Sequence, residues 1–304
     1  MSEYDPFAAG PFAVDERTFT LHDPARERDF AVAVWSPAET GSHPLIVYSH
    51  HSGGNRRVAA LLCGHLASHG YEVAAMDHSE VAAREQLPAE RSARLDAIIA
   101  GRVPDIRLLI DHFGREEVGL VGHSFGGWAV LATPEVDDRV GSVVAMGPGG
   151  SESPRPGILP VRLTFRWRRS IPTLYLAAEN DVPIPLAGVY EIFDRAPQPK
   201  RLLVLRRADH QHFLDDIEGA HEAARNATFP PEAAWIPAAM VPIGELTQAE
   251  QAHDFVHGLP VAHLDATLRR SEAGQQFLDG AVVGALAARG VDATQPSRSR
   301  STRR

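Results

Sequence analysis

One short motif limits the folds open to this chain, the pentapeptide Gly122-His123-Ser124-Phe125-Gly126. It follows the apolar run Val118–Val121, which has the length of a buried strand, and it precedes a helix-like segment, Trp128–Thr133. Glycines on both sides of a serine allow a sharp strand-to-helix turn without a steric clash. The motif therefore predicts that Ser124 presents its hydroxyl at a strand end and at a helix N-terminus, which favours negative charge.

Apolar runs and helix-like segments alternate along the rest of the chain. An antiparallel hairpin is expected at the start, over Arg17–Leu21 and Phe30–Trp35. Helices are expected over Arg56–His69, Pro88–Phe113 with a break at Pro104, and Thr247–Arg289. Further short apolar runs predict buried strands at Leu45–Tyr48, Val73–Met76, Val140–Met146, Thr173–Ala178 and Arg201–Leu205. This order predicts an α/β fold with a mostly parallel central sheet and helices on both faces.

Two segments, Pro148–Ser170 and Glu222–Ile243, lack clear periodicity. The first follows the sixth strand, where a cap or rim loop would fall, and its short length predicts a small or absent cap. No linker is long enough to separate two domains. We therefore expect a single domain over residues 1–290, followed by a disordered basic tail over residues 291–304.

Charge and composition restrict the partners. The net charge of −9 argues against a nucleic-acid partner, because phosphate binding needs a basic face. No apolar run approaches the length of a membrane span, and the acidic start lacks the pattern of a signal peptide. The single cysteine, Cys63, has no partner for an internal disulfide and is expected to be buried on the helix facing the sheet. We expect a cytoplasmic protein.

A serine hydroxyl is a weak nucleophile that needs a base, a group that orients the base, and donors for an oxyanion. Asp181 follows the strand Thr173–Ala178 and is the expected acid, with Glu179 as a local competitor. The expected base is His210, in the loop after the strand Arg201–Leu205, and His212 is an alternative. This chain order of serine, acid and histidine is that of α/β hydrolases.

Backbone N–H groups are expected to bind the oxyanion. One donor should be the N–H of Phe125, the residue after Ser124. The second should come from the glycine-containing loop after Leu45–Tyr48, where Ser52 is the first choice and His51 the second.

These segments together resemble the dienelactone hydrolase and platelet-activating-factor acetylhydrolase-like branch of the α/β hydrolases. The segment from Ser49 to Gly54 is similar to the family's Ser-His-Gly-x-Gly motif, and residues 122–127 are similar to its nucleophile elbow. The segment from His210 to Phe213 resembles the His-x-x-Phe motif that carries the base, which favours His210 over His212. The resemblance spans about residues 17–215.

The chain departs from this family in three places. His51 replaces a glycine of the oxyanion segment, and a serine stands where dienelactone hydrolases have a cysteine nucleophile. The acetylhydrolases carry their acid in an Asp-Pro step after the sixth strand, where this chain has Gly147-Pro148. The missing carboxylate strengthens Asp181 as the acid.

The resemblance implies a serine esterase that forms an acyl-enzyme on a small-molecule ester, expected to be small or short-chain, without a cofactor. Acyl transfer or thioester cleavage on the same triad, and a non-catalytic binding protein, are the alternatives. No metal site is expected, because His50, His51 and His123 near the proposed site lack the helical His-x-x-x-His spacing of a zinc helix.

Overall fold

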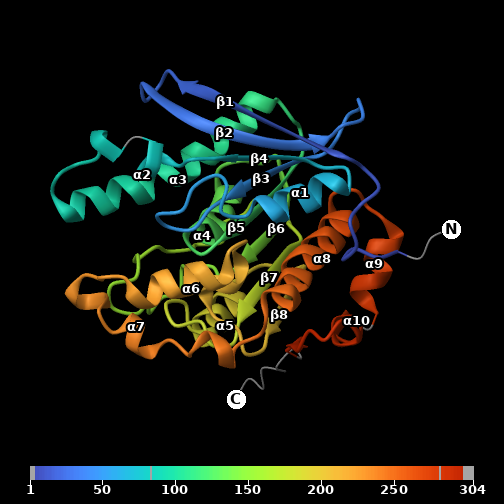
Figure 1. Ribbon diagram of the computed structural model, residues 1–304. Helices are drawn as coiled ribbons and strands as arrows, with labels where there is room; N and C mark the ends of the chain where they lie inside the picture. Colours follow the sequence, from blue (N-terminus) through green and yellow to red (C-terminus); the bar gives the residue numbers. More distant parts are fainter. Residues whose placement is uncertain (1–3, 83, 281, 297–304) are drawn as a thin grey trace, which may run out of the picture.

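A sheet runs through the molecule, with helices on both of its faces (Figure 1). The computed structural model describes residues 4–82, 84–280 and 282–296, and in these ranges the sheet has nine strands. Their order is β1-β2-β4-β3-β5-β6-β7-β8-β9. The strands are β1 (Val14–Asp23), β2 (Arg28–Pro37), β3 (Leu45–Ser49), β4 (Glu72–Met76), β5 (Val118–His123), β6 (Val140–Met146), β7 (Thr173–Ala178), β8 (Lys200–Leu205) and β9 (Ala293–Thr294).

The central strands, from β4 to β8 in the sheet order, are parallel to one another. The hairpin of β1 and β2 joins one edge antiparallel, and β9 joins the other edge antiparallel. Parallel neighbours place their carboxyl ends at the same edge of the sheet, so the loops after β3, β5, β7 and β8 meet there. The predicted α/β fold with a mostly parallel sheet is confirmed.

The two faces of the sheet bury separate cores because successive side chains of a strand alternate in direction. In β3, Ile46 and Tyr48 pack with α1 (Ala60–Ser68) and α8 (Ala249–Thr267). Leu45 and Val47 pack on the other face with α3 (Arg91–Phe113) and α4 (Phe125–Ala132). Cys63 of α1 is fully buried in the first of these cores, as predicted. The helices are α1 (Ala60–Ser68), α2 (Ser79–Ala82), α3 (Arg91–Phe113), α4 (Phe125–Ala132), α5 (Leu186–Arg195), α6 (Ile217–Asn226), α7 (Ile236–Ala239), α8 (Ala249–Thr267), α9 (Glu272–Asp279) and α10 (Val282–Ala288).

Helix α3 differs from the prediction, because it continues through Pro104 instead of breaking there. Proline removes one helical hydrogen bond, but both adjoining turns are held by buried side chains. Arg102 and Asp105 are fully buried and hydrogen-bonded, and Ile106 packs in the core next to them. Burial on both sides of the proline therefore keeps the helix continuous.

The segment Glu222–Ile243 was expected to be irregular but contains the second half of α6 and all of α7. Helix α6 begins earlier, at Ile217, because the carboxylate of Asp216 caps it by accepting the N–H of Gly219 at 2.9 Å. The other irregular segment, Pro148–Ser170, has neither helix nor strand.

The C-terminal part of the chain is ordered further than predicted. Val291 is buried, and Ala293–Thr294 pair with Val204 and Leu205 of β8, so the start of the expected tail at residue 291 is wrong. The rest of that tail, residues 297–304, lies outside the described residues. The single domain over residues 1–290 stays a prediction.

Each helix in the described ranges is too short or too polar to cross a lipid bilayer.

Candidate active site

Ser124 lies on a strained turn between β5 and α4. Its φ of 58° and ψ of −115° are rare for a residue with a side chain. The turn is held from both sides, because the Ser124 N–H donates to the Met146 carbonyl at 2.8 Å and its carbonyl accepts the Trp128 N–H at 3.0 Å. A Cβ atom at Gly122 would lie 2.4 Å from the Gly126 carbonyl oxygen, so the turn requires glycine there. The backbone conformation of the elbow therefore restricts which residues can stand in the motif.

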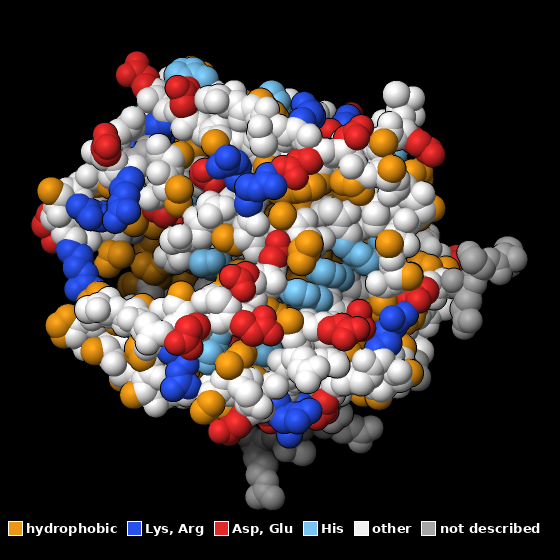
Figure 2. All heavy atoms as spheres, in the orientation of Figure 1, with side chains coloured by type: hydrophobic (Ala, Val, Ile, Leu, Met, Phe, Trp, Pro, Cys, Tyr) orange, Lys and Arg blue, Asp and Glu red, His pale blue; other side chains and the backbone are white. Residues whose placement is uncertain are grey.

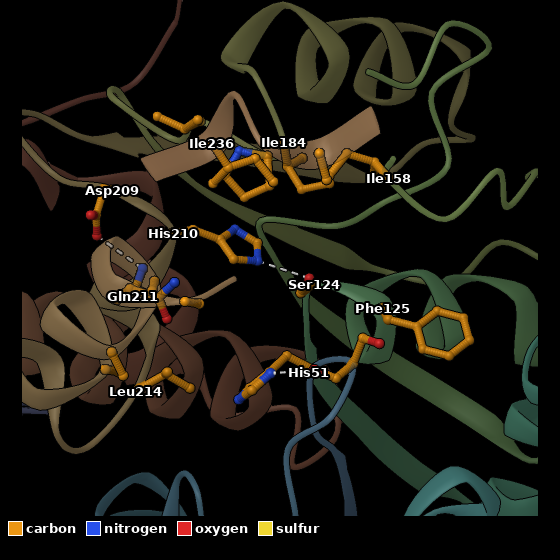
Figure 3. A pocket seen from close by; sticks show the side chains of 18 of the residues that line it. His51, Ser124, Phe125, Ile158, Ile184, Asp209, His210, Gln211, Leu214 and Ile236 are labelled. Carbon is orange, nitrogen blue, oxygen red and sulfur yellow. Dashed lines mark hydrogen bonds between the residues drawn. The ribbon is translucent and has the colours of Figure 1, made fainter. Parts of the chain in front are cut away.

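His210 lies between Ser124 and Asp181. Its Nε2 is 2.8 Å from the Ser124 Oγ, and its Nδ1 is 2.7 Å from the Asp181 Oδ2 (Figure 3 shows the bond to Ser124). The other carboxylate oxygen of Asp181 accepts the backbone N–H of Ile184 at 2.7 Å. With the proton on Nδ1, His210 donates to Asp181 and leaves Nε2 free to accept the serine proton.

The electrostatics of this pair favour a protonated His210. Burial alone would lower the pKa of His210, but the carboxylate of Asp181 outweighs it and raises the pKa above its ordinary value of 6.5. Asp181 is almost fully buried, and in the described ranges its oxygens have two hydrogen-bond donors, so its charge acts on the imidazole with little screening. The imidazolium that forms when His210 takes a proton is therefore stabilised.

Gly147 leaves the space that the Asp181 carboxylate occupies. It follows β6 with a φ of 47°, and a Cβ atom on it would lie 3.2 Å from the Asp181 Oδ2. By the resemblance drawn from the sequence, this position corresponds to the Asp-Pro step of the acetylhydrolases. Asp181 follows β7, and its carboxylate reaches His210 beside Gly147. Gly147 follows β6, where this chain has no carboxylate.

The two alternative residues lie elsewhere. Glu179 pairs with Arg206, with 2.6 Å between the Glu179 Oε1 and the Arg206 Nη1. His212 is fully buried, with its Nδ1 2.8 Å from the Asp209 Oδ1 and its Nε2 3.0 Å from the Thr247 carbonyl oxygen. Both ring nitrogens of His212 are thus bound to other groups, and the structure does not bring either alternative to Ser124.

The predicted oxyanion donors border the same cavity as Ser124. Phe125 begins α4, so its N–H has no acceptor within the helix, and its ring points away from His210 (Figure 3). Ser52 and His51 line the cavity from the loop after β3. The His51 ring is bound to its own loop, with 2.9 Å between its Nδ1 and the Ser52 carbonyl oxygen.

The cavity beside Ser124 has a volume of about 860 Å³. Figure 2 shows a hollow lined by hydrophobic side chains, which lies between α2 and α6 as they are labelled in Figure 1. In the close view, Ile158, Ile184 and Ile236 lie on one side of His210 (Figure 3). Part of the wall is a small cluster made by Val182 with residues of the α7 region, which packs apart from the two main cores. The charged side chains of the lining are Arg57, Asp209, Asp215 and Asp216.

Sequence reasoning did not identify Arg102, although it contacts the oxyanion loop. This side chain is fully buried, and its Nη1 donates to the His50 carbonyl at 2.5 Å. The available signal was a charged residue on the apolar face of a helix, in line with Ile106 and Leu109. The residues of α6 and α7 that line the cavity were also missed, because their segment looked irregular.

Within the ranges that the structure describes, no cluster of three or more His, Cys, Asp or Glu side chains is arranged to hold a metal ion.

Comparison with known proteins supports the resemblance drawn from the motifs. Residues 30–96 match the family described as "Platelet-activating factor acetylhydrolase, isoform II". The chain is 23% identical over 231 residues to a platelet-activating factor acetylhydrolase of Cavia porcellus, and 24% identical over 235 residues to that of Bos taurus. Each alignment covers 60% of this chain and 51% of the relative, so the chain spans about half the length of the curated relatives it matches.

A solved structure has a similar fold. The ferulic acid esterase from Streptomyces cinnamoneus superposes with a TM-score of 0.61 and 18% sequence identity, and the match covers 86% of this chain and 91% of that chain. The chain thus has the α/β-hydrolase fold, and the predicted resemblance to this group of serine esterases is confirmed.

Proposed function

We propose that the protein is a serine hydrolase that cleaves carboxylic esters through an acyl-enzyme. The observation that carries the proposal is the continuous chain of hydrogen bonds from Asp181 through His210 to Ser124, beside a cavity. The similarity to acetylhydrolases and to an esterase fold supports the same class of reaction. Among the residues that the structure describes, His210 is the acid or base that is hydrogen-bonded to the Ser124 Oγ.

In the proposed reaction the Ser124 Oγ attacks the ester carbonyl carbon while His210 Nε2 takes the hydroxyl proton. The N–H groups of Phe125 and Ser52 bind the oxyanion of the tetrahedral intermediate. Collapse of this intermediate breaks the bond to the alcohol, which leaves with the proton from His210. Water then attacks the acyl-enzyme in the same way, which releases the acid and restores the serine.

The cavity favours an ester with a larger apolar group than the small or short-chain one predicted from the sequence. A volume of about 860 Å³ lies near the upper end of the range for small-molecule sites. Apolar side chains from several separate segments line it, among them Ile158, Ile184, Phe229, Ile236 and Met240. Burying a hydrocarbon group there is worth about 0.8 kcal/mol per methylene, which gives longer chains an advantage in binding.

The test is hydrolysis of p-nitrophenyl acetate, butyrate, octanoate and laurate by the parent protein and by Ser124→Ala. We expect turnover by the parent, a KM that falls with chain length, and no turnover by the variant. A folded parent that binds the esters without hydrolysing them would contradict the proposal and would favour a binding protein. Turnover of acetate alone would retain the reaction and refute the larger substrate.

A further inference from the structure

Arg102 is the largest fully buried side chain of the described residues, and all of its hydrogen-bond donors are occupied. Nε donates to Glu80 at 3.1 Å, and Nη2 makes a second, shorter bond to the same carboxylate. Nη1 donates to the His50 carbonyl at 2.5 Å and lies 3.4 Å from the Ser49 Oγ. Nη2 also donates to the His51 carbonyl at 3.2 Å. Five N–H groups thus meet five acceptors, which matches the donor number of a guanidinium.

One of these bonds reaches the peptide group of a proposed oxyanion donor, and it joins two contacts within the loop, from the Gly54 N–H at 3.1 Å and the His50 Nδ1 at 2.7 Å, on the same His51 oxygen. The His51 carbonyl and the Ser52 N–H belong to the same peptide group, whose two polar ends point in opposite directions when the bond is trans. This bond is trans, because the only cis peptide in the described ranges precedes Pro199. Holding the His51 oxygen on the side of Arg102 turns the Ser52 N–H away from Arg102. A hydrogen bond to the carbonyl also makes the N–H of that peptide a stronger donor.

The same guanidinium contacts the residue that carries the other proposed donor. Its Cζ lies 4.3 Å from the centre of the Phe125 ring, within the distance of a cation–π contact. The N–H of Phe125 begins α4 next to Ser124, so a fixed Phe125 ring helps to fix this N–H. A lysine in place of Arg102 has three donors and no planar surface to stack on the ring.

We propose that Arg102 is the positioning residue of the oxyanion hole, because it fixes the loop that carries Ser52 and the residue Phe125 at the same time. This inference rests on the proposed esterase function. Arg102 touches neither the substrate nor the reacting atoms. Its role differs from that of a purely structural ion pair, since two carbonyls of one catalytic loop and the ring of the elbow residue all converge on one side chain.

The experiment compares Arg102→Lys with a matched control, Arg26→Lys. Arg26 is partly buried, with 23% of its side chain exposed, and it pairs with Asp23 and Asp105. In the described ranges none of its own bonds reaches the loop after β3 or Phe125. Active sites are counted with a fluorophosphonate, and kcat and KM are then measured per active site on a p-nitrophenyl ester. The inhibition constant of a trifluoromethyl ketone, which forms an oxyanion on the serine, is measured in parallel.

We expect Arg102→Lys to lower kcat per active site by about 10–100-fold with little change in KM, because loss of one oxyanion donor costs about 10²–10³ and a misplaced donor costs less. Affinity for the trifluoromethyl ketone should fall by a similar factor, whereas Arg26→Lys should retain the parental values. A purely structural Arg102 would lower the melting temperature and the number of active sites but not kcat per site, and that result would overturn the inference.

If Arg102→Lys does not fold, the double variant Arg102→Gln with Glu80→Gln takes its place. It removes both charges together and leaves no uncompensated buried ion. Parental kcat per active site in this folded variant would also overturn the inference, and a loss of the same size in kcat and ketone affinity would support it. A parent protein that neither reacts with the fluorophosphonate nor hydrolyses esters would refute the proposed function itself, independently of the variants.

Discussion

Replacing Asp181 by asparagine should preserve the fold and remove most of the activity. The Ile184 N–H donates to the Asp181 Oδ1 at 2.7 Å, so that position requires an acceptor. Asparagine must therefore place its carbonyl oxygen there and its NH2 group at the position of Oδ2, 2.7 Å from His210 Nδ1. Since an NH2 group can only donate, His210 Nδ1 must accept, and the ring proton moves to Nε2.

This tautomer cannot act as the base, because its Nε2 carries a proton 2.8 Å from the Ser124 Oγ. In a serine protease the equivalent substitution lowers kcat by about 10⁴. We expect a loss of about 10³–10⁴ in kcat/KM here, which corresponds to about 4–5.5 kcal/mol of transition-state stabilisation. The assay is p-nitrophenyl ester hydrolysis, with circular dichroism melting as a check on the fold.

The matched control is Glu179→Gln, the same change of carboxylate to amide at the competing residue on the same strand end. Glu179 is paired with Arg206 and does not touch His210, so the activity of this variant should equal that of the parent. A folded Asp181→Asn variant that keeps parental kcat/KM would refute the assignment of Asp181 as the acid that orients His210. A Glu179→Gln variant that loses activity would refute it as well.

Three further results are expected. Because the base must be neutral and Asp181 raises the pKa of His210 above 6.5, kcat/KM should fall as the pH drops through a value above 6.5, and this limb of the pH profile should move to lower pH in Asp181→Asn. His212→Gln should lower the free energy of unfolding by about 1–3 kcal/mol, measured by urea denaturation, because it breaks buried bonds, while kcat per titrated active site stays parental. Ala224→Phe should fill part of the cavity, which would raise the KM for laurate and leave acetate turnover unchanged; an equal effect on both esters would contradict the proposed substrate position.

The sequence was sufficient to predict those elements whose structure depends on residues close together in the chain. The strands Val140–Met146 and Thr173–Ala178 have the predicted bounds, because short apolar runs buried on both faces leave little freedom. The elbow around Ser124 was predictable for a related reason, since the close contact between Gly122 and Gly126 excludes side chains there. Placing His210 and Asp181 at the ends of consecutive strands followed from the parallel order of the sheet.

The features that sequence did not predict depend on contacts between distant segments. Arg102 bonds to His50 and His51, which lie 52 and 51 positions earlier in the chain, and a single sequence contains no signal for such a pairing. Helix α3 continues through Pro104 because buried neighbours outweigh the lost hydrogen bond. The wall of the cavity formed by Phe229, Ile236 and Met240 is made of short elements whose periodicity is too brief to detect.

The proposed function depends on an activated serine at position 124, and covalent labelling measures this directly. The parent protein, Ser124→Ala and His210→Gln would be treated with a fluorophosphonate, and the adduct located by mass spectrometry of the peptides. We predict one adduct on Ser124 in the parent, none in Ser124→Ala, and a labelling rate in His210→Gln that is lower by about 10³ or more. A well-folded parent that takes up no label, or that carries its label on another residue, would contradict the proposed role of Ser124.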